Sequence, residues 1–215
     1  MVSRPAYSAD TVFDQQPPER ARLLHAARRL MLTYGYQAFT MDQLAHELGV
    51  SKKTLYVHFP SKDAIVNQII DLMGASIQGG MKAVLADPTL TFPQRISGVV
   101  DVASANLARL SPAVLRDLER FAPATYRKIE DIRSQTIPVV FGQLVRMGIA
   151  EGKVRADVDP AFAAEFWLQA IRGLVQPAVL ERTQLTLPQT LQRGLHLFFS
   201  GLLTPAGRKE YEKST

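Results

Sequence analysis

The stretch from Ala38 to Ala64, AFTMDQLAHELGVSKKTLYVHFPSKDA, decides the fold. Its periodicity predicts two short helices joined by a tight turn. Thr40 is a suitable N-cap for the first helix, with Gln43 three residues later in the position that completes a capping box. Gly49 can adopt the left-handed conformation that ends a helix, and Ser51 can cap the next one. The stretch therefore reads as helix, glycine turn and helix.

The two predicted helices each have an apolar inner face. Leu44 and Leu48 share one face of the first helix, and Leu55 and Phe59 lie four residues apart in the second. Pro60 prevents a smooth continuation. The outer side chains of the second helix are basic or carry hydrogen-bonding groups: Lys52, Lys53, Thr54, Tyr56 and His58. This pattern is typical of a helix-turn-helix, whose second helix lies in the DNA major groove with its first residues facing base edges.

The run from Arg22 to Ile65 resembles the DNA-binding domain of TetR-family transcriptional regulators. Matching residues occur before, within and after the predicted turn, over more than forty positions, which makes the resemblance far more specific than a lone helix-turn-helix pattern. They are the Leu-Leu-x-Ala-Ala of Leu23 to Ala27, Gly35-Tyr36, Phe39-Thr40, Leu44-Ala45, Gly49-Val50-Ser51, Thr54-Leu55-Tyr56, His58-Phe59 and Ser61-Lys62.

The resemblance implies a set of DNA-contacting residues in and beside these helices: Thr40, Met41, Lys52, Lys53, Thr54, Tyr56, His58 and Lys62. Lys52 and Lys53 begin the recognition helix, where the helix dipole also favours an anion, and lysine can bind a phosphate or a guanine edge. Members of the family often have a small residue where Lys53 stands, so we expect this lysine to set a base preference. Lys62 matches the family's phosphate-clamping lysine. For Thr40 and His58, a purely capping role and an ordinary surface position are the alternatives.

Composition agrees with a folded protein that binds a polyanion. The 215 residues are 47% hydrophobic, and the net charge of +5 with a pI near 9.6 fits a nucleic-acid partner. Residues 1–63 carry 8 basic and 6 acidic groups, so the positive charge is not concentrated there. The absence of cysteine excludes disulfides and thiolate chemistry. We identify no apolar run long enough for a membrane span and no signal peptide, so we expect a soluble, cytoplasmic protein.

The predicted fold class is all-α, with about nine helices in two domains. An N-terminal three-helix helix-turn-helix domain (18–63) binds DNA, and a larger C-terminal helical domain (64–205) binds ligand and dimerises. Flexible tails are expected at 1–17 and 206–215. Arg4 in the first tail can reach a phosphate or the minor groove as homeodomain arms do, although an idle tail is the stronger alternative. The predicted helices cover residues 18–34, 40–48, 51–59, 61–86, 91–107, 112–121, 123–148, 160–180 and 187–203.

The resemblance also implies an effector pocket among the middle helices. Its apolar and aromatic candidates are Met73, Ile77, Phe92, Phe121, Tyr126, Phe141 and Trp167. Such a lining indicates a small hydrophobic or aromatic effector, while ordinary core packing is the alternative for each residue. The helix that begins at Ser61 is the natural lever between pocket and DNA.

The last two predicted helices are more apolar than a single buried face requires, with Phe162 and Leu197 among their apolar side chains. The resemblance implies that they pack on a two-fold mate as a four-helix bundle. The expected interface residues are Phe166, Ile171, Leu174, Leu191, Leu195, Phe198 and Leu202. The alternative is that both faces are buried within one chain. A homodimer would place two recognition helices about 34 Å apart on a palindromic operator.

Two other classes of function compete with this interpretation. An enzyme is a poor fit, because the four histidines are scattered and no nucleophile motif, glycine-rich phosphate loop or metal-ligand spacing is present; no cofactor or metal is expected. A helical dimer that binds small molecules or proteins without reading DNA is the second, and the intact set of DNA-facing side chains argues against it. The prediction is a dimeric, sequence-specific regulator, by default a repressor released from DNA by its effector.

Overall fold

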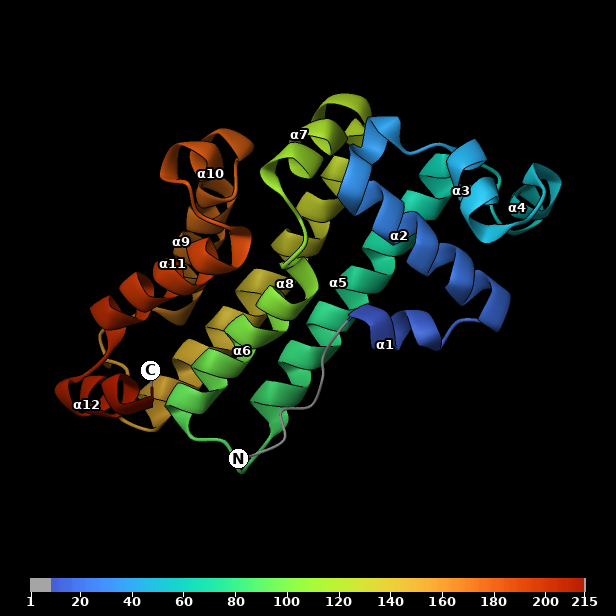
Figure 1. Ribbon diagram of the computed structural model, residues 1–215. Coiled ribbons are helices and arrows are strands. Elements are labelled where there is room, and N and C mark those ends of the chain that lie inside the picture. Colours follow the sequence, from blue (N-terminus) through green and yellow to red (C-terminus); the bar gives the residue numbers. More distant parts are fainter. Residues whose placement is uncertain (1–8, 215) are drawn as a thin grey trace. The chain divides into compact units, whose positions relative to one another are not determined.

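The computed structural model describes residues 9–214, so Arg4 and the rest of segment 1–8 lie outside the described residues. Twelve helices make up most of the described chain, and the one β-bridge recorded there pairs Val154 with Leu203 (Figure 1). The all-α prediction is confirmed. The helices are α1 (Ala9–Asp14), α2 (Pro18–Ala38), α3 (Met41–Leu48), α4 (Lys52–His58), α5 (Lys62–Ala86), α6 (Phe92–Leu107), α7 (Pro112–Phe121), α8 (Pro123–Ala150), α9 (Pro160–Leu174), α10 (Pro177–Thr183), α11 (Leu187–Leu202) and α12 (Pro205–Ser214).

Helices α1 and α12 form in segments that the sequence predicted to be flexible tails. Phe13 of α1 is fully buried, and its ring centroid lies 5.3 Å from that of His25 on α2. Tyr211 of α12 is buried as well and stacks on His196 of α11 at 5.8 Å. One aromatic anchor orders each otherwise polar segment, which composition alone does not reveal.

The helix predicted for residues 160–180 is two helices. α9 ends at Leu174, and α10 begins at Pro177 as its first helical residue. Proline has no N–H to donate and disfavours helical geometry in the residue before it, so the chain breaks at Gln176. With α1 and α12, this break accounts for the three helices beyond the nine predicted.

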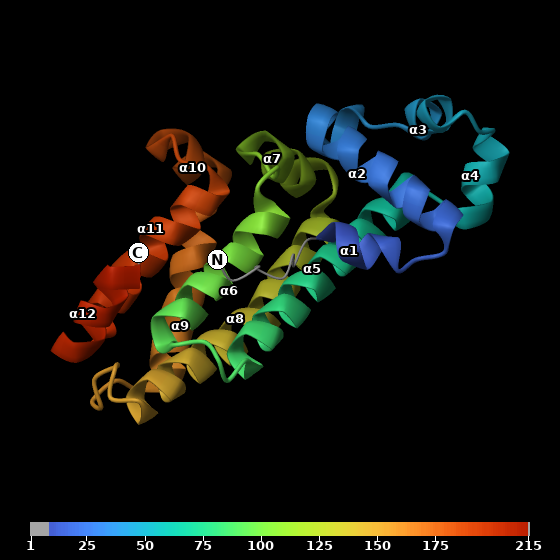
Figure 2. The same cartoon turned by 60° about the horizontal axis from the view of Figure 1, so that its bottom comes forward.

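The chain divides into two compact units. The first contains Met1–Ile77 and Arg109–Glu130, and the second contains Gln78–Ala108 and Asp131–Thr215. In the first unit, α2, α3 and α4 surround a core in which Leu44, Leu55 and Phe59 are all buried. α7 packs against α2 in the same unit (Figures 1 and 2). The predicted domain 18–63 thus lies inside a larger compact unit.

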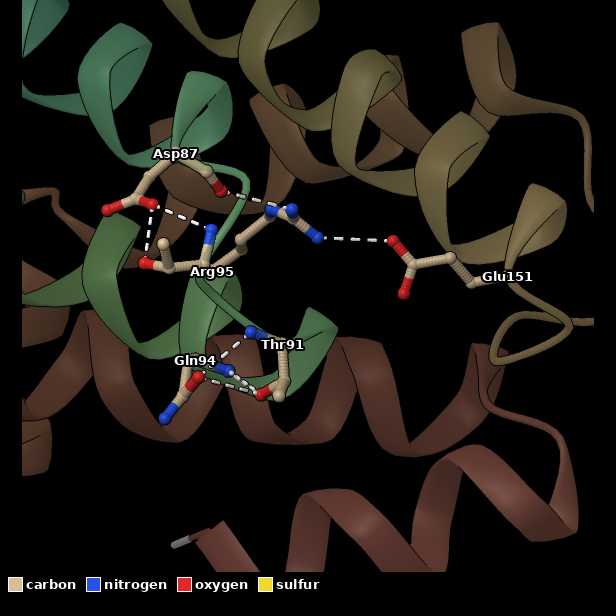
Figure 3. Close-up of polar contacts among 6 residues, drawn as sticks. Asp87, Thr91, Gln94, Arg95 and Glu151 are labelled. Carbon is tan, nitrogen blue, oxygen red and sulfur yellow. Dashed lines mark hydrogen bonds and ion pairs between the residues drawn. The ribbon is translucent and has the colours of Figure 1, made fainter.

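In the second unit a buried arginine ties three segments together (Figure 3). Arg95 of α6, whose side chain is 10% exposed, donates to the carbonyl oxygen of Asp87 at 3.1 Å. Its other terminal nitrogen pairs with the Glu151 carboxylate, also at 3.1 Å. The start of α6 is therefore joined to the residue after α5 and the residue after α8. The two donated bonds offset part of the cost of burying the guanidinium.

Helix α5 is long and apolar enough to cross a membrane, alone among the helices of the described residues. This differs from the sequence expectation that no run reaches that length. However, 56% of its most apolar window is buried inside the chain, and a core helix of a soluble protein meets the same criterion. The burial of α5 is that of a core helix.

Candidate nucleic-acid interface

The start and end of α3 have the predicted cap geometry. The Thr40 hydroxyl accepts the Gln43 N–H at 3.2 Å, and the Thr40 N–H donates to the Gln43 side chain at 2.9 Å, which completes the capping box. Gly49 follows α3 with φ 66° and ψ 31°, and its N–H returns to the carbonyl oxygens of Ala45 and His46. A positive φ is inexpensive only for a residue without a Cβ, so this glycine sets the angle between α3 and α4.

Helix α4 presents its outer face to solvent. The Ser51 hydroxyl accepts the Thr54 N–H at 3.1 Å and also lies 2.9 Å from the Thr54 hydroxyl, so it caps the helix. Leu55 is the buried residue of α4. Of the predicted outer side chains, Lys52, Lys53, Thr54 and Tyr56 are exposed, whereas His58 is half-buried.

Val57 is the residue of this face that sequence reasoning missed. It is 77% exposed, the most exposed large apolar side chain described in the first unit. A search for basic and hydroxyl groups does not select a valine. The spacing does indicate its position, because Val57 follows Lys53 by four residues and so lies on the same helix face. An exposed apolar group there can contact a thymine methyl, which is part of base readout.

Two arginines of α2 hold the ends of the helix-turn-helix, and neither was predicted. Arg22 donates to the carbonyl oxygen of Leu48, at the end of α3, at 2.8 Å. Arg20 donates to the carbonyl oxygen of His58, at the end of α4, at 3.0 Å, and its guanidinium lies 4.1 Å from the centre of the Phe59 ring. The last carbonyls of a helix lack intrahelical partners and carry its negative dipole end, so a cation there stabilises the helix.

Three of the predicted DNA-contacting side chains already have partners within the chain. Lys52 forms an ion pair with Asp42, and the His58 Nε2 lies 3.4 Å from the Glu19 carboxylate. The Lys62 ammonium donates to the carbonyl oxygen of Tyr36 at 3.1 Å and lies 4.2 Å from that ring's centre. Lys62 is half-buried, and Lys53 is exposed at the start of α4. Of the remaining predicted contacts, Thr40 is exposed and Met41 half-buried.

The predicted effector-pocket residues do not fall in one unit. Met73, Ile77, Phe121 and Tyr126 belong to the first unit, and Phe92, Phe141 and Trp167 to the second. Phe121 is 40% exposed, with the Arg120 guanidinium 5.1 Å from its ring centre. It lies on the surface rather than in an enclosed site, because α7 turns only its Val114, Leu115 and Leu118 face inward.

The three pocket candidates of the second unit are part of an aromatic cluster: Phe92, Phe141, Phe166, Trp167, Phe198 and Phe199. The centroid of Trp167 lies 5.2 Å from those of both Phe141 and Phe198. Phe166 and Phe198 stack at 6.2 Å. Residues predicted for the pocket and residues predicted for the dimer interface therefore pack on one another in a single aromatic cluster.

The predicted dimer interface needs correction. Ile171, Leu195 and Phe198 are buried within the chain, because α9 and α11 pack against each other through this face. Leu174, Leu191 and Leu202 are half-buried. The outward apolar residues are Phe162 (72% exposed), Phe166 (57%) and Leu197 (75%), which we call the outer α9–α11 face.

Residues 23–69 match the family model described as bacterial regulatory proteins, tetR family. The chain belongs to the TetR family. It is 24% identical to the HTH-type transcriptional regulator UidR of Escherichia coli K12 over 206 residues, which cover 91% of this chain and 98% of UidR. It is 20% identical to YvaF of Bacillus subtilis over 181 residues, covering 84% and 94% of the two chains.

Among solved structures, the chain is similar to the transcriptional regulator FadR from Bacillus subtilis, crystallised in complex with stearoyl-CoA. The TM-score is 0.61 at 20% identity, covering 84% of this chain and 98% of FadR. At that identity the likeness establishes the fold. Together with the family match and the regulator relatives, it identifies a DNA-binding transcriptional regulator of the TetR family and points away from an enzyme.

Proposed function

We propose that this regulator is a cytoplasmic homodimer that binds a palindromic operator through α4, represses transcription, and is released by a small hydrophobic or aromatic effector. The observation that carries the proposal is the outer face of α4. It bears Lys52, Lys53 and Tyr56 in solvent, while caps and two arginines fix the helix ends. A rigid, cationic and exposed recognition helix is what major-groove reading requires.

The contacts divide into two kinds. Lys53 and Val57 share the exposed face of α4 and are the candidates for base edges. Lys52 and His58 have acidic partners that DNA phosphates would replace, and Lys62 lies at the start of α5. Phosphate contacts supply salt-dependent affinity for any duplex, and base contacts supply the sequence preference.

The homodimer is supported by the outer α9–α11 face, where three large apolar side chains are exposed. Monomeric soluble proteins rarely leave large contiguous apolar patches uncovered, and a two-fold partner presenting the same face would bury this one. Replacing Leu197 with Glu is expected to produce monomers in sedimentation experiments. It should also lower operator affinity, because a single helix-turn-helix domain makes half of the DNA contacts.

The effector class rests on the apolar and aromatic character of the second unit and on analogy. Phe141 and Trp167 are buried in an aromatic cluster, and the similar FadR binds stearoyl-CoA. A ligand that binds better to one dimer geometry than to the other shifts the population of DNA-competent dimers, with coupling of about 1–3 kcal/mol. α5 is a single continuous helix from Lys62 to Ala86, which suits it to transmit a change of dimer geometry to the helix-turn-helix domain.

The decisive experiment is selection of bound duplexes from a random pool, followed by titrations at several salt concentrations. A palindromic site with half-sites about one helical turn apart supports the proposal. On that site Lys53→Ala should alter the preference among operator variants. Lys62→Ala should weaken all duplexes alike and flatten the salt dependence. If the protein is a stable dimer but the selection enriches no sequence, the result would favour the alternative of a binding module that does not read DNA.

A further inference from the structure

Helix α2 is interrupted at Gly35, three residues before its end at Ala38. Gly35 has φ 88° and ψ 167°, a conformation that L side chains rarely adopt. A Cβ built on Gly35 would lie 2.8 Å from a carboxylate oxygen of Asp117 on α7. Glycine is therefore required here both for the backbone angle and for the close approach of α7.

Asp117 provides a hydrogen-bond acceptor for the backbone that follows the break. One of its carboxylate oxygens accepts the N–H of Gln37 at 2.6 Å, across 80 residues of sequence. An interrupted helix leaves N–H groups without their usual carbonyl partners. A carboxylate that accepts a backbone N–H forms a charge-assisted bond, which is stronger than a neutral one.

The residue between Gly35 and Gln37 is fixed by the first turn of α5. Tyr36 is 6% exposed, and its hydroxyl donates to the Asp63 carboxylate. Lys62 donates to its carbonyl oxygen at 3.1 Å. Burial first, and then the hydrogen bond to Asp63, raise the pKa of Tyr36 well above its ordinary value, so the hydroxyl remains a donor at neutral pH.

Residues 35–37, which we call the joint, lie just before the helix-turn-helix in the chain. Thr40, the N-cap of α3, comes three residues after Gln37, and Phe39 between them is fully buried. A displacement of Gln37 is therefore passed to the start of α3, and through the Gly49 turn to α4. The orientation of the recognition helix α4 therefore depends on the backbone from Gln37 to Thr40.

We propose that Asp117 is a positioning residue for DNA binding. By accepting the Gln37 N–H it holds α3 and α4 in the DNA-competent orientation relative to α7. This inference rests on the proposed operator binding, but it concerns a residue outside the DNA-contacting surface and outside the segment 23–69 that matches the family model.

The test compares Asp117→Ala, Asp117→Asn and Glu119→Ala in the full-length protein, with the selected operator as the duplex. Asp117→Ala removes the acceptor and should raise Kd about tenfold, because fewer molecules have the competent orientation. Asp117→Asn keeps an amide oxygen that can accept the same N–H, so Kd should stay within about threefold of wild type. Glu119 is exposed on α7, and its replacement makes the same charge change without touching the joint.

Three results would overturn the proposal: unchanged affinity in Asp117→Ala, equal losses in Asp117→Ala and Glu119→Ala, or equal losses in Asp117→Ala and Asp117→Asn. The last would assign the effect to charge instead of the hydrogen bond. Circular dichroism and thermal unfolding of each variant identify any loss that comes from unfolding, and Asp117→Asn then remains the informative comparison with wild type.

A second measurement needs no DNA. The chain has no cysteine, so His46→Cys on α3 and Ala113→Cys on α7, both exposed positions, accept spin labels without background. Doubly labelled protein is mixed with excess unlabelled wild type, so that both labels belong to one chain. Asp117→Ala should broaden the distance distribution, and Asp117→Asn should keep it narrow. If wild type binds no duplex, the proposed function fails, and this distribution still decides the role of Asp117: an unchanged width refutes it.

Discussion

In the helix-turn-helix, polar groups at helix ends determine the geometry, whereas α9 and α11 are joined by packed rings. Around α3 and α4, hydroxyl caps begin the helices and arginine side chains bind the carbonyls that end them. Around Trp167, the contacts are aromatic pairs with ring centroids 5.2 Å apart. Short helices bury little area, so their direction depends on directional bonds. The α9–α11 pair gains its stability from buried area and depends less on any single bond.

The largest expected effect lies in the aromatic cluster. Trp167→Ala should lower the free energy of unfolding by about 3–5 kcal/mol, because the cavity left between Phe141 and Phe198 cannot collapse fully. Trp167→Phe keeps much of the volume and should cost clearly less. Urea unfolding at fixed protein concentration measures both, since a dimer's stability depends on concentration. Equal losses in the two variants would show that the cluster depends on one specific contact, contrary to the comparison.

The next effect should come from the arginine at the end of α4. Arg20→Ala removes a charge-assisted bond to the His58 carbonyl and the contact with the Phe59 ring, and should cost about 2 kcal/mol and weaken operator binding. Arg29→Ala is the matched control, because Arg29 is 60% exposed and pairs with Glu47 on the surface. Such a pair is worth about 0–1 kcal/mol. If both variants lose the same stability, helix-end bonding is not what holds α4.

The contrast also explains how far the sequence could be interpreted. Caps and turns are local: Thr40 with Gln43, Gly49 and Ser51 lie within twelve residues, and the structure has them as predicted. The helix break at Gly35 is local too, and the sequence predicts the helix to end at residue 34, just before it. Side chains that act across long sequence separations, such as Arg20, Arg22 and Asp117, carry no local signature.

The division between buried and exposed apolar residues in α9 and α11 could not be predicted for the same reason. Both helices are apolar over much of their circumference, so periodicity does not tell which face meets the neighbouring helix. Ile171 and Leu195, which the sequence predicts in the dimer interface, are buried within the chain, while Phe162 and Leu197 are exposed. Only the packing partner decides, and that partner is distant in sequence.

A third prediction separates cap chemistry from its location. Thr40→Ala and Thr91→Ala each destroy a capping box, the first at α3 and the second at α6 in the other unit. Each should cost about 1 kcal/mol in unfolding free energy. Only Thr40→Ala should also lower operator affinity, because α3 supports the recognition helix. Binding titrations beside thermal unfolding test this. A comparable loss of DNA affinity in Thr91→Ala would mean that α6 contributes to DNA binding as directly as α3 does.

The smallest expected effect is a pH dependence in the second unit, at the turn between α5 and α6. The Thr89 hydroxyl donates to the Asp87 carboxylate at 2.6 Å and the Thr89 N–H donates at 2.8 Å. The hydroxyl bond first, and then the N–H bond, hold the pKa of Asp87 below its ordinary value of 3.8. A carboxyl whose pKa is lower in the folded than in the unfolded state stabilises the fold above the unfolded pKa. That contribution disappears as the pH falls through the folded pKa.

Urea midpoints of wild type and Asp87→Asn, measured between about pH 6 and pH 2, test this dependence. The wild type should be slightly more stable at the upper end, and the difference should vanish at the lower end. Because the carboxyl is exposed, solvent screens it and the shift in midpoint should be far smaller than that caused by Trp167→Ala. A difference that persists at the acid end would show that it does not come from the carboxylate charge. Equal midpoints at every pH would mean that hydrogen bonding alone holds the turn, as the amide-for-carboxylate exchange at Asp117 is expected to show in the first unit.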